Sequence, residues 1–314
     1  MRFSIGLPVT KTIFLESTIL SILSQTYPEY EVIIQNNAEN NSSREEIRNI
    51  IHPYLKHNNF QYYENEEQLN ISDNFNLILN KAIGDYFIIL SDDDLLLPKA
   101  LEEYDKLINE FKECNIYHCR VRLINELNNV IHFTPICDKF ETLPDFMFHR
   151  LAGYRQQFLS DFLVSRKKLI EIGGFPVLAF GWGVDDLTWF LLAENGIAYT
   201  PFIGLNYRVF SNNFTNSKMG YKTSLLKLID IDTIYKRFSE ITSKNSFKEK
   251  SIYTNDIFDK LINKAKTKAF CELFRIIGTK NNLVSTFLFY LKNKKKYGLN
   301  FIVFLYAVKG NLIN

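Results

Sequence analysis

The chain has 314 residues, 46% of them hydrophobic and 23% charged, which fits a soluble globular protein of one large domain, or of one domain with an appendage. No apolar run reaches the ~18 residues of a membrane-spanning helix, and the opening MRFSIGLPVTK lacks the long apolar segment of a secretory signal. The net charge of +2 hides an asymmetry, because residues 222–314 hold 18 Lys and Arg against 7 Asp and Glu, a net of +11, which leaves a net of −9 for residues 1–221. This split indicates two regions with different partners.

The first hundred residues alternate predicted strands and helices. The predicted strands are FSIGLPV (3–9), YEVIIQ (30–35) and DYFIIL (85–90), and the predicted helices are LESTILSILSQ (15–25) and ISDNFNLILNKAIG (71–84). For the second helix, Ser72 or Asp73 is the expected N-cap and Gly84 the expected stop. This order predicts an α/β protein with a doubly wound, mainly parallel sheet.

Three consecutive aspartates follow the third strand, in IILSDDDLLLP (88–98). Ligands of doubly wound sheets bind beyond the carboxyl ends of the strands, where the loops after Val9, Gln35 and Leu90 should converge. A solvated acidic loop is the simpler interpretation, but the immediate return to apolar residues weakens it. Clustered carboxylates keep their charge beside a hard cation, and Mg²⁺ usually shares one or two carboxylates with phosphates. The pattern therefore favours a divalent cation and a phosphorylated ligand.

Other phosphate-binding classes lack their motifs in this chain. It contains no GxxxxGK[ST] loop, no GxGxxG after the first strand and no GxGxR-type loop of nucleotidyltransferases. The cysteines show no CxxC spacing and are expected to be reduced core thiols; they are Cys114, Cys119, Cys137 and Cys271.

Five segments in order resemble family 2 glycosyltransferases with the GT-A fold. They are SIGLPV (4–9), SILSQTYPEYEVIIQNN (21–37), NKAIGDYFIILSDDDLLLP (80–98), SRKKLIEIGGFPVLAFGWGVDDLTWFLLAENG (165–196) and YRVFSNNFT (207–215). The resemblance covers about residues 1–215. It implies a GT-A catalytic domain over 1–220, with a basic, mostly helical region over 221–314 outside it.

The resemblance also implies roles for individual residues. Asp93 would ligate Mn²⁺ or Mg²⁺ on the donor diphosphate, Asp94 would ligate or support the metal, and Asp92 would lie near the ribose. The remaining donor-binding residues would be Pro8, Thr10, Asn37, Asn74 and Arg208, with Asn37 on the nucleobase and Pro8 and Thr10 lining its pocket. A surface salt bridge is the alternative for Arg208.

Asp186, or else Asp185, would be the general base that deprotonates the acceptor hydroxyl. Such a base typically contributes ~10²–10⁴ in rate. The alternative for this pair is an N-cap and first-turn acid of the following helix. Trp182 could form an acceptor platform or pack in the core, and Trp189 is expected in the core.

Two positions depart from the family pattern. Phe75 follows Asn74 where many members have an arginine, and Phe210 stands where many have a histidine ligand. The metal and Arg208 would then carry more of the phosphate charge.

The basic C-terminal region contains IFDKLINKAKTKAFCELFRIIG (257–278), with Ile257, Leu261, Ala265 and Phe270 roughly on one helical face, and a lysine cluster at Lys292 and 294–296. These features indicate either helices that pack on the catalytic domain or an anchor on an anionic membrane surface. A nucleic-acid tail is disfavoured by the long apolar runs.

The predicted function is metal-dependent, inverting transfer of a sugar from a nucleotide-sugar, with UDP favoured by family frequency, to a glycan or polyprenyl-linked acceptor. The expected setting is bacterial surface polysaccharide synthesis at the cytoplasmic face of the membrane. The alternatives are a catalytically silent sugar-binding or scaffold protein and a nucleotidyltransferase. The sequence does not predict an oligomeric state.

Overall fold

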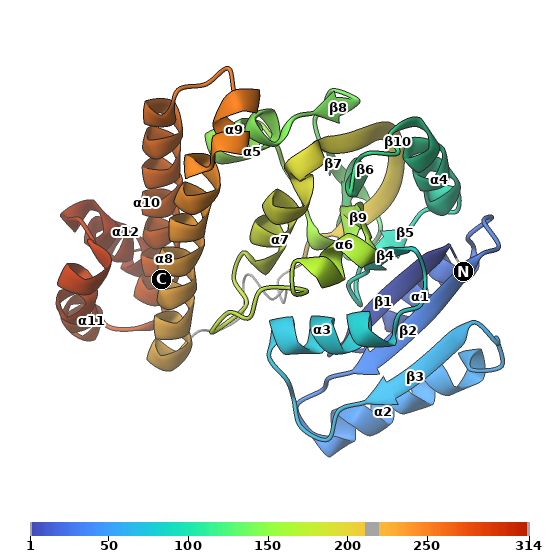
Figure 1. Cartoon of the computed structure of the whole chain (residues 1–314). Coiled ribbons are helices and arrows are strands. Elements are labelled where there is room, and N and C mark those ends of the chain that lie inside the picture. Colours follow the sequence, from blue (N-terminus) through green and yellow to red (C-terminus); the bar gives the residue numbers. More distant parts are fainter. Residues whose placement is uncertain (1, 211–219, 313–314) are drawn as a thin grey trace. The chain divides into compact units, whose positions relative to one another are not determined.

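The computed structural model describes residues 2–210 and 220–312 (Figure 1). The chain divides into two compact units, the first made of Met1–Val177 and Thr188–Phe210 and the second of Leu178–Leu187 and Ser211–Asn314. The sequence predicted a single boundary at residue 220. In the structure, residues 178–187 lie before that boundary but belong to the second unit.

The first unit contains the sheet and the helices beside it. Its strands are β1 (Phe3–Val9), β2 (Tyr30–Asn36), β3 (Phe60–Glu64), β4 (Tyr86–Ile89), β5 (Leu95–Leu96), β6 (Ile116–Ile124), β7 (Val130–Phe133), β8 (Phe140–Glu141), β9 (Phe162–Ser165) and β10 (Ile197–Arg208). Its helices are α1 (Leu15–Leu23), α2 (Asn41–Ile51), α3 (Ile71–Lys81), α4 (Ala100–Glu110), α5 (Leu143–Ala152), α6 (Arg166–Glu171) and the later part of α7 (Val184–Leu192).

The main path of the sheet has the strand order β3-β2-β1-β4-β9-β6-β10-β5. The first four strands are parallel, as the βαβαβ pattern predicts. β9 then runs antiparallel to both of its neighbours, β4 and β6, so the second half of the sheet is mixed. The predicted α/β class is confirmed, and the parallel half places the ends of β1, β2 and β4 at one edge.

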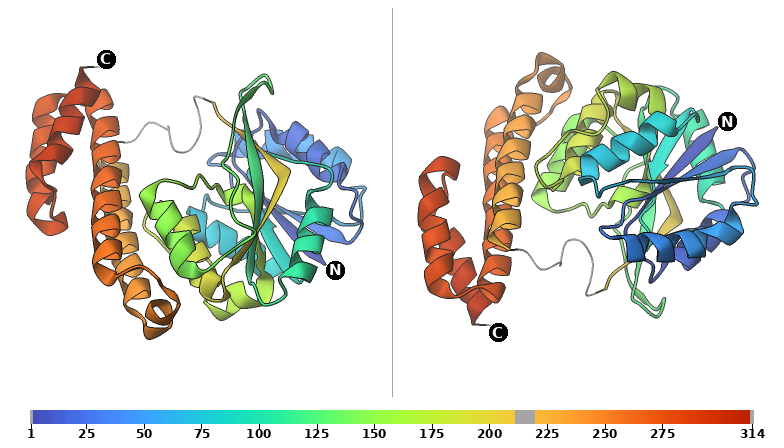
Figure 2. Two further views of the ribbon diagram at one scale, coloured as in Figure 1. Left: turned by 90° about the horizontal axis from the view of Figure 1, so that it is seen from above. Right: turned by 90° about the horizontal axis from the view of Figure 1, so that it is seen from below.

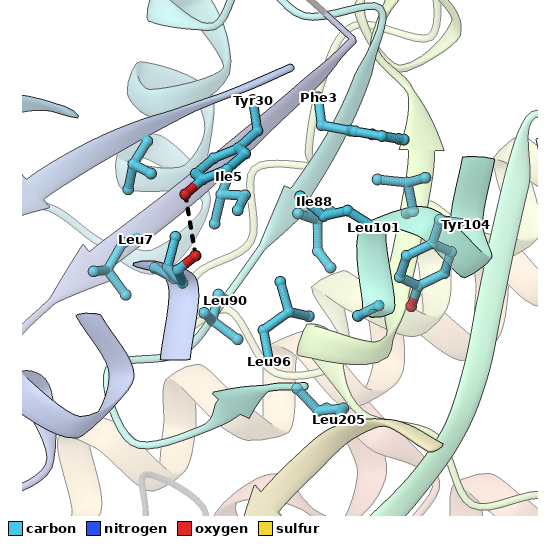
Figure 3. Close-up of a cluster of buried hydrophobic side chains, with 14 of the residues drawn as sticks. Phe3, Ile5, Leu7, Tyr30, Ile88, Leu90, Leu96, Leu101, Tyr104 and Leu205 are labelled. Atoms are coloured by element: carbon cyan, nitrogen blue, oxygen red, sulfur yellow. Dashed lines mark hydrogen bonds between the residues drawn. The ribbon is translucent and has the colours of Figure 1, made fainter. Parts of the chain in front are cut away.

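Both faces of the central strands are buried. In β1 the alternate residues Phe3, Ile5 and Leu7 belong to the same apolar cluster as residues of α1, α2 and α4 (Figure 3). Tyr30 extends this cluster, and its hydroxyl donates a hydrogen bond of 3.2 Å to the Ile22 carbonyl. Each such buried side chain contributes ~1.5–3 kcal/mol, so the alternation fixes the register of the sheet.

Helix α3 covers the opposite face. A Cβ at Gly6 would lie 2.6 Å from Ile78 of α3, so glycine permits this close approach. The helix begins at Ile71, but the expected N-cap at Ser72 or Asp73 is wrong, because the cap is Asn70, whose side chain accepts the Asp73 N–H at 2.9 Å. The helix already ends at Lys81, before the expected stop at Gly84.

The described part of the second unit is helical, as predicted for the basic region. Its helices are α8 (Tyr221–Ser243), α9 (Asn245–Lys250), α10 (Asn255–Lys280), α11 (Leu283–Tyr297), α12 (Phe301–Asn311) and the first turn of α7. Helix α10 packs against α8 and α12 (Figure 2). Within residues 2–210 and 220–312, no helix has the length and hydropathy that crossing a bilayer requires.

Helix α10 buries a different face from the predicted one. Ile257 is 38% exposed, whereas its neighbour Phe258 is 1% exposed and Ile262 is 3% exposed. The predicted face was therefore off by one residue at its start, and it meets the buried face only near Phe270. Close helix crossing also shapes this packing, because Gly278 lies directly against the backbone of Ala307.

Candidate functional site

The loops after β1, β2 and β4 meet at one edge of the sheet. One carboxylate oxygen of Asp92 accepts the main-chain N–H of Thr10 at 2.8 Å and that of Lys11 at 2.9 Å. The Asn37 N–H donates to the Val9 carbonyl at 2.8 Å. The predicted convergence of these loops is confirmed. The Asp92 carboxylate links the loop after β4 to the loop after β1.

The side chains of the three consecutive aspartates lie in three different environments. Asp94 is 0% exposed, and its two oxygens accept the Ser160 hydroxyl at 2.7 Å and the Arg208 N–H at 3.0 Å. Asp92 is 8% exposed and binds the β1 loop. Asp93, between them, is half-buried, and no other residue in the described part of the chain donates a hydrogen bond to its carboxylate.

Burial disfavours the charged form of all three acids. It raises the pKa of Asp93 to about 6, with a further contribution from the negative charge of Asp92, while Lys11 and Arg208 oppose the rise. Burial and the charge of Asp93 raise the pKa of Asp94 well above its usual value. A bound cation would relieve this repulsion.

The donor set fits a cation that the protein shares with its ligand. Within the described ranges no group of three or more His, Cys, Asp or Glu side chains could enclose a metal. Asp93 offers one carboxylate toward solvent, and Mg²⁺ or Mn²⁺ commonly combines such a ligand with phosphate oxygens and water. The contacts of Asp94 suit support of the loop better than direct ligation.

Arg208 lies beneath the aspartate loop. It is 1% exposed, so the alternative of a surface salt bridge is wrong. Its guanidinium donates to the Asp93 carbonyl at 2.9 Å and to the Asn128 side chain at 2.8 Å, and it stacks on Phe14, with 4.0 Å to the ring centroid. These contacts hold the loop in place, and contact with a donor diphosphate stays a prediction.

Asn37 and Asn74 belong to one buried amide network. The Asn37 side-chain oxygen accepts the Leu69 N–H and the Asn65 amide, both at 2.8 Å. The same Asn65 amide donates to Asn74 at 3.0 Å. The network therefore fixes the 65–70 loop, and recognition of a nucleobase by Asn37 stays a prediction.

Pro8 is half-buried and Thr10 is exposed at the end of β1, and their role in lining a nucleobase pocket stays a prediction. Lys11 is a further candidate that the sequence reasoning missed. Its charge lowers the pKa of both Asp92 and Asp93, so it lies near the acids. A lysine two residues after the end of the first strand was the available signal.

The two departures from the family pattern are packed side chains. Phe75 is 6% exposed and meets Phe175 edge-on with 5.3 Å between ring centroids. Phe210 is 7% exposed and meets Phe14 edge-on, also at 5.3 Å. Both positions thus serve packing. The rest of the YRVFSNNFT motif, residues 211–215, lies outside the described residues.

Asp185 and Asp186 lie in the first turn of α7, and both are half-buried. Because the helix begins at Val184, both are first-turn acids, a position that the helix dipole favours. This end of α7 belongs to the second unit, whereas the aspartate loop belongs to the first. The role of either acid as a general base stays a prediction.

The two tryptophans differ in their surroundings. Trp189 is 1% exposed and stacks on Phe162 at 4.9 Å, which confirms its predicted core position. Trp182 is half-buried before α7, with its ring 6.2 Å from that of Tyr235. Its role as an acceptor platform stays a prediction.

Known structures share this fold. TarS residues 1–349 of S. aureus in complex with UDP-GlcNAc superposes with a TM-score of 0.57 at 13% identity, over 96% of this chain and 93% of that one. The mannosyltransferase PcManGT of Pyrobaculum calidifontis, in complex with GDP-Man and Mn²⁺, gives a TM-score of 0.55 at 14% identity, over 98% and 86%. These likenesses confirm the predicted GT-A type of fold.

Sequence comparison extends the likeness. The uncharacterized glycosyltransferase MJ1057 of Methanocaldococcus jannaschii is 31% identical over 136 residues, which are 43% of this chain and 46% of that protein. The match thus spans less than half of the relative. Residues 13–169, half of the chain, match the model of Glycosyl transferase family 2. The chain therefore belongs to glycosyl transferase family 2.

Proposed function

We propose that this protein transfers a sugar from a nucleotide-sugar donor to a hydroxyl group of a glycan or lipid-linked acceptor. The proposal rests on one observation, namely that the three aspartates have different hydrogen-bond partners. Asp92 and Asp94 are used by the protein to shape the loop, which leaves the Asp93 carboxylate at the carboxyl edge of the sheet. The two structural neighbours support the donor class, since one holds UDP-GlcNAc and the other GDP-Man.

Asp93 would hold Mn²⁺ or Mg²⁺ at this edge. A bound divalent cation neutralises the negative charge that builds on the leaving diphosphate. Asp92 contributes by fixing the main chain of Thr10 and Lys11, and the Lys11 ammonium adds positive charge near the same place. The Arg208 guanidinium supports the loop by donating a hydrogen bond to the Asp93 carbonyl.

The transfer would invert the anomeric centre. The acceptor oxygen forms a bond to the anomeric carbon while the bond from that carbon to the diphosphate oxygen breaks, through an oxocarbenium-like transition state. The proton of the acceptor hydroxyl passes to a carboxylate, for which Asp186 is our first candidate and Asp185 the second. Both acids lie in the first turn of α7.

A panel of UDP- and GDP-sugars, with and without Mn²⁺, tests the proposal. We expect metal-dependent thermal stabilisation and slow hydrolysis that releases a nucleoside diphosphate from at least one donor. A silent sugar-binding protein would bind without hydrolysis or transfer. A nucleotidyltransferase would instead release pyrophosphate from a nucleoside triphosphate and a sugar phosphate.

We also propose that the second unit attaches the enzyme to an anionic membrane surface, where a polyprenyl-linked acceptor would be presented. Helix α11 buries Tyr290 and Asn293 but leaves Val284 72% exposed and Leu288 60% exposed. Helix α12 leaves Phe301 56% exposed. The lysines at Lys292 and 294–296 are all exposed beside this apolar face, a combination that suits anionic lipid. The setting that we propose for such an acceptor is the synthesis of a bacterial surface polysaccharide.

A further inference from the structure

A buried carboxylate in the second unit collects four consecutive main-chain amides. Asp230 of α8 is 0% exposed. Its oxygens accept N–H groups at 2.8, 2.9, 2.8 and 3.1 Å, from Ala179, Phe180, Gly181 and Trp182 respectively. Hydrogen bonds to a charged acceptor are roughly twice as strong as neutral ones. The carboxylate therefore fixes the main chain of this segment, residues 179–182, which we call the amide loop.

The amide loop and the glycine that follows it, Gly183, contact α8 at further points. Gly181 and Gly183 have φ angles of 96° and 74°, which side-chain-bearing residues rarely adopt. A Cβ at Gly183 would lie 2.7 Å from the end of Ile234, one turn along α8 from Asp230. The ring of Trp182 lies near that of Tyr235. The loop is thus seated on α8 by a charge and by close packing.

The amide loop leads directly into the first turn of α7. Only Gly183 and Val184 separate Trp182 from Asp185, so the main chain that Asp230 fixes sets where α7 begins and where its two acids lie. Burial raises the pKa of Asp230, while the amide hydrogen bonds oppose this rise. Neutralising Asp230 would leave its amide partners with a weaker acceptor.

We propose that Asp230 is a positioning residue for the acidic pair Asp185 and Asp186, so that a carboxylate of the C-terminal region is part of what makes the site competent. This inference rests on the proposed function, in which one of the pair is the base. It assigns the C-terminal helices a role in turnover that is separate from any membrane attachment.

The test compares Asp230→Asn with Asp232→Asn. Asp232 lies on the same helix but pairs with Lys236 and Lys266, each at 2.7 Å, so it is a matched control that removes the same charge. We expect Asp230→Asn to lower kcat by roughly 10²-fold, the effect of misplacing a catalytic group by about 1 Å. The affinity for the nucleotide donor should stay within a few-fold, because the proposed donor residues belong to the first unit. Asp232→Asn should leave both values near those of the wild type.

Hydrogen exchange of residues 178–187 supplies a second readout. Faster exchange there in Asp230→Asn, with unchanged exchange in β1 and β4, together with the loss of kcat supports the inference. Faster exchange with wild-type kcat overturns the inference and leaves the proposed function standing. If Asp230→Asn does not fold, Gly183→Ala disturbs the same loop through its φ angle and Ile234, and wild-type kcat in that variant overturns the inference. A wild-type protein that neither transfers nor hydrolyses any donor overturns the proposed function itself.

Discussion

Side-chain direction explains why three adjacent acids can share one loop. Asp92 turns to the amides after β1, Asp94 turns to Ser160 and the Arg208 main chain, and Asp93 is left toward solvent. The sequence predicted an acidic site at this place because a charged run stops an apolar strand. The family resemblance implied a role for each acid, but the sequence did not predict the partners that hold Asp92 and Asp94, because partners such as Ser160 lie far away along the chain.

Replacing Asp93 separates function from stability. Asp93→Ala should abolish metal-dependent donor binding and transfer without lowering the melting temperature, because its carboxylate binds no other described side chain. Asp94→Ala is the contrasting variant and should lose ~1–3 kcal/mol of unfolding free energy, since it leaves the buried Arg208 N–H without this acceptor and the Ser160 hydroxyl with only the longer contact to Ser91. Isothermal titration with donor and Mn²⁺, together with thermal unfolding, measures both. Near wild-type turnover of Asp93→Ala would show that the metal assignment is wrong.

The acids of α7 are distinguished by paired amide substitutions. Asp186→Asn should keep donor affinity within a few-fold and reduce kcat by roughly 10²–10⁴, the loss expected for a missing general base. Asp185→Asn is the matched comparison, since it makes the same change one residue away in the same helical turn. A larger loss of kcat in Asp185→Asn would assign the base to Asp185. Unchanged kcat in both variants would leave the pair with a role in the helix terminus only.

Among the elements, strands were predicted more closely than helix ends. β1 has the predicted bounds because its apolar run ends abruptly at Thr10. The N-cap of α3 was missed because Asn70, Ser72 and Asp73 are all good caps, and only the main-chain geometry selects Asn70. The prediction of the buried face of α10 was wrong because this helix packs against three others, and their positions determine which of its apolar residues are covered.

A buried lysine predicts a pH dependence within the helical unit. Lys227 of α8 is 5% exposed, and burial lowers its pKa from 10.5 to about 8. Below pH 8 the ammonium is charged in both the folded and unfolded states, so the cost of burying it is fully present. Between pH 8 and 10.5 the unfolded chain binds more protons, and this group therefore makes stability rise with pH, by about 3 kcal/mol at most.

The substitution Lys227→Met removes that cost. We expect the variant to be more stable than the wild type by roughly 1–3 kcal/mol at pH 7, with the difference shrinking as pH rises from 8 to 10. Lys222→Met is the control, because Lys222 is an exposed lysine of the same helix. Urea unfolding at several pH values measures the difference. A stability gain that does not change with pH would contradict the assignment to Lys227.

At the scale of the whole molecule, the sequence predicted two regions from charge, a net of −9 against +11. It did not predict that residues 178–187 group with the C-terminal helices, although they lie inside a family-like motif. The contacts responsible join positions about 50 residues apart, such as Trp182 and Asp230, and no local pattern encodes them. Periodicity also did not predict that α11 buries polar side chains such as Asn293.

The apolar face of α11 and α12 is the feature that a membrane would cover. On α11 the exposed Val284, Leu288 and Leu291 recur every three to four residues, opposite the buried Thr286 and Tyr290. A solvent-facing stripe of this kind usually marks an interaction surface. The adjoining lysines add an attraction that salt screens over a Debye length of ~8–10 Å, whereas insertion of apolar side chains is not screened.

Two sets of variants separate these contributions. The first variant changes four lysines of α11 to Gln, at Lys292, Lys294, Lys295 and Lys296. It should bind vesicles rich in phosphatidylglycerol more weakly by a few kcal/mol, at ~1 kcal/mol per charge. A control variant with four Lys→Gln changes elsewhere in the second unit should lose less binding; its changes are at Lys244, Lys248, Lys250 and Lys260. Leu288→Ser should remove part of the binding that survives high salt, and none of these variants should alter turnover of a short soluble acceptor. Sedimentation with anionic and with neutral phosphatidylcholine vesicles measures each effect. If the two lysine sets bind anionic vesicles equally, the cluster on α11 is not the anchor, and the lysines there only keep the helix in water.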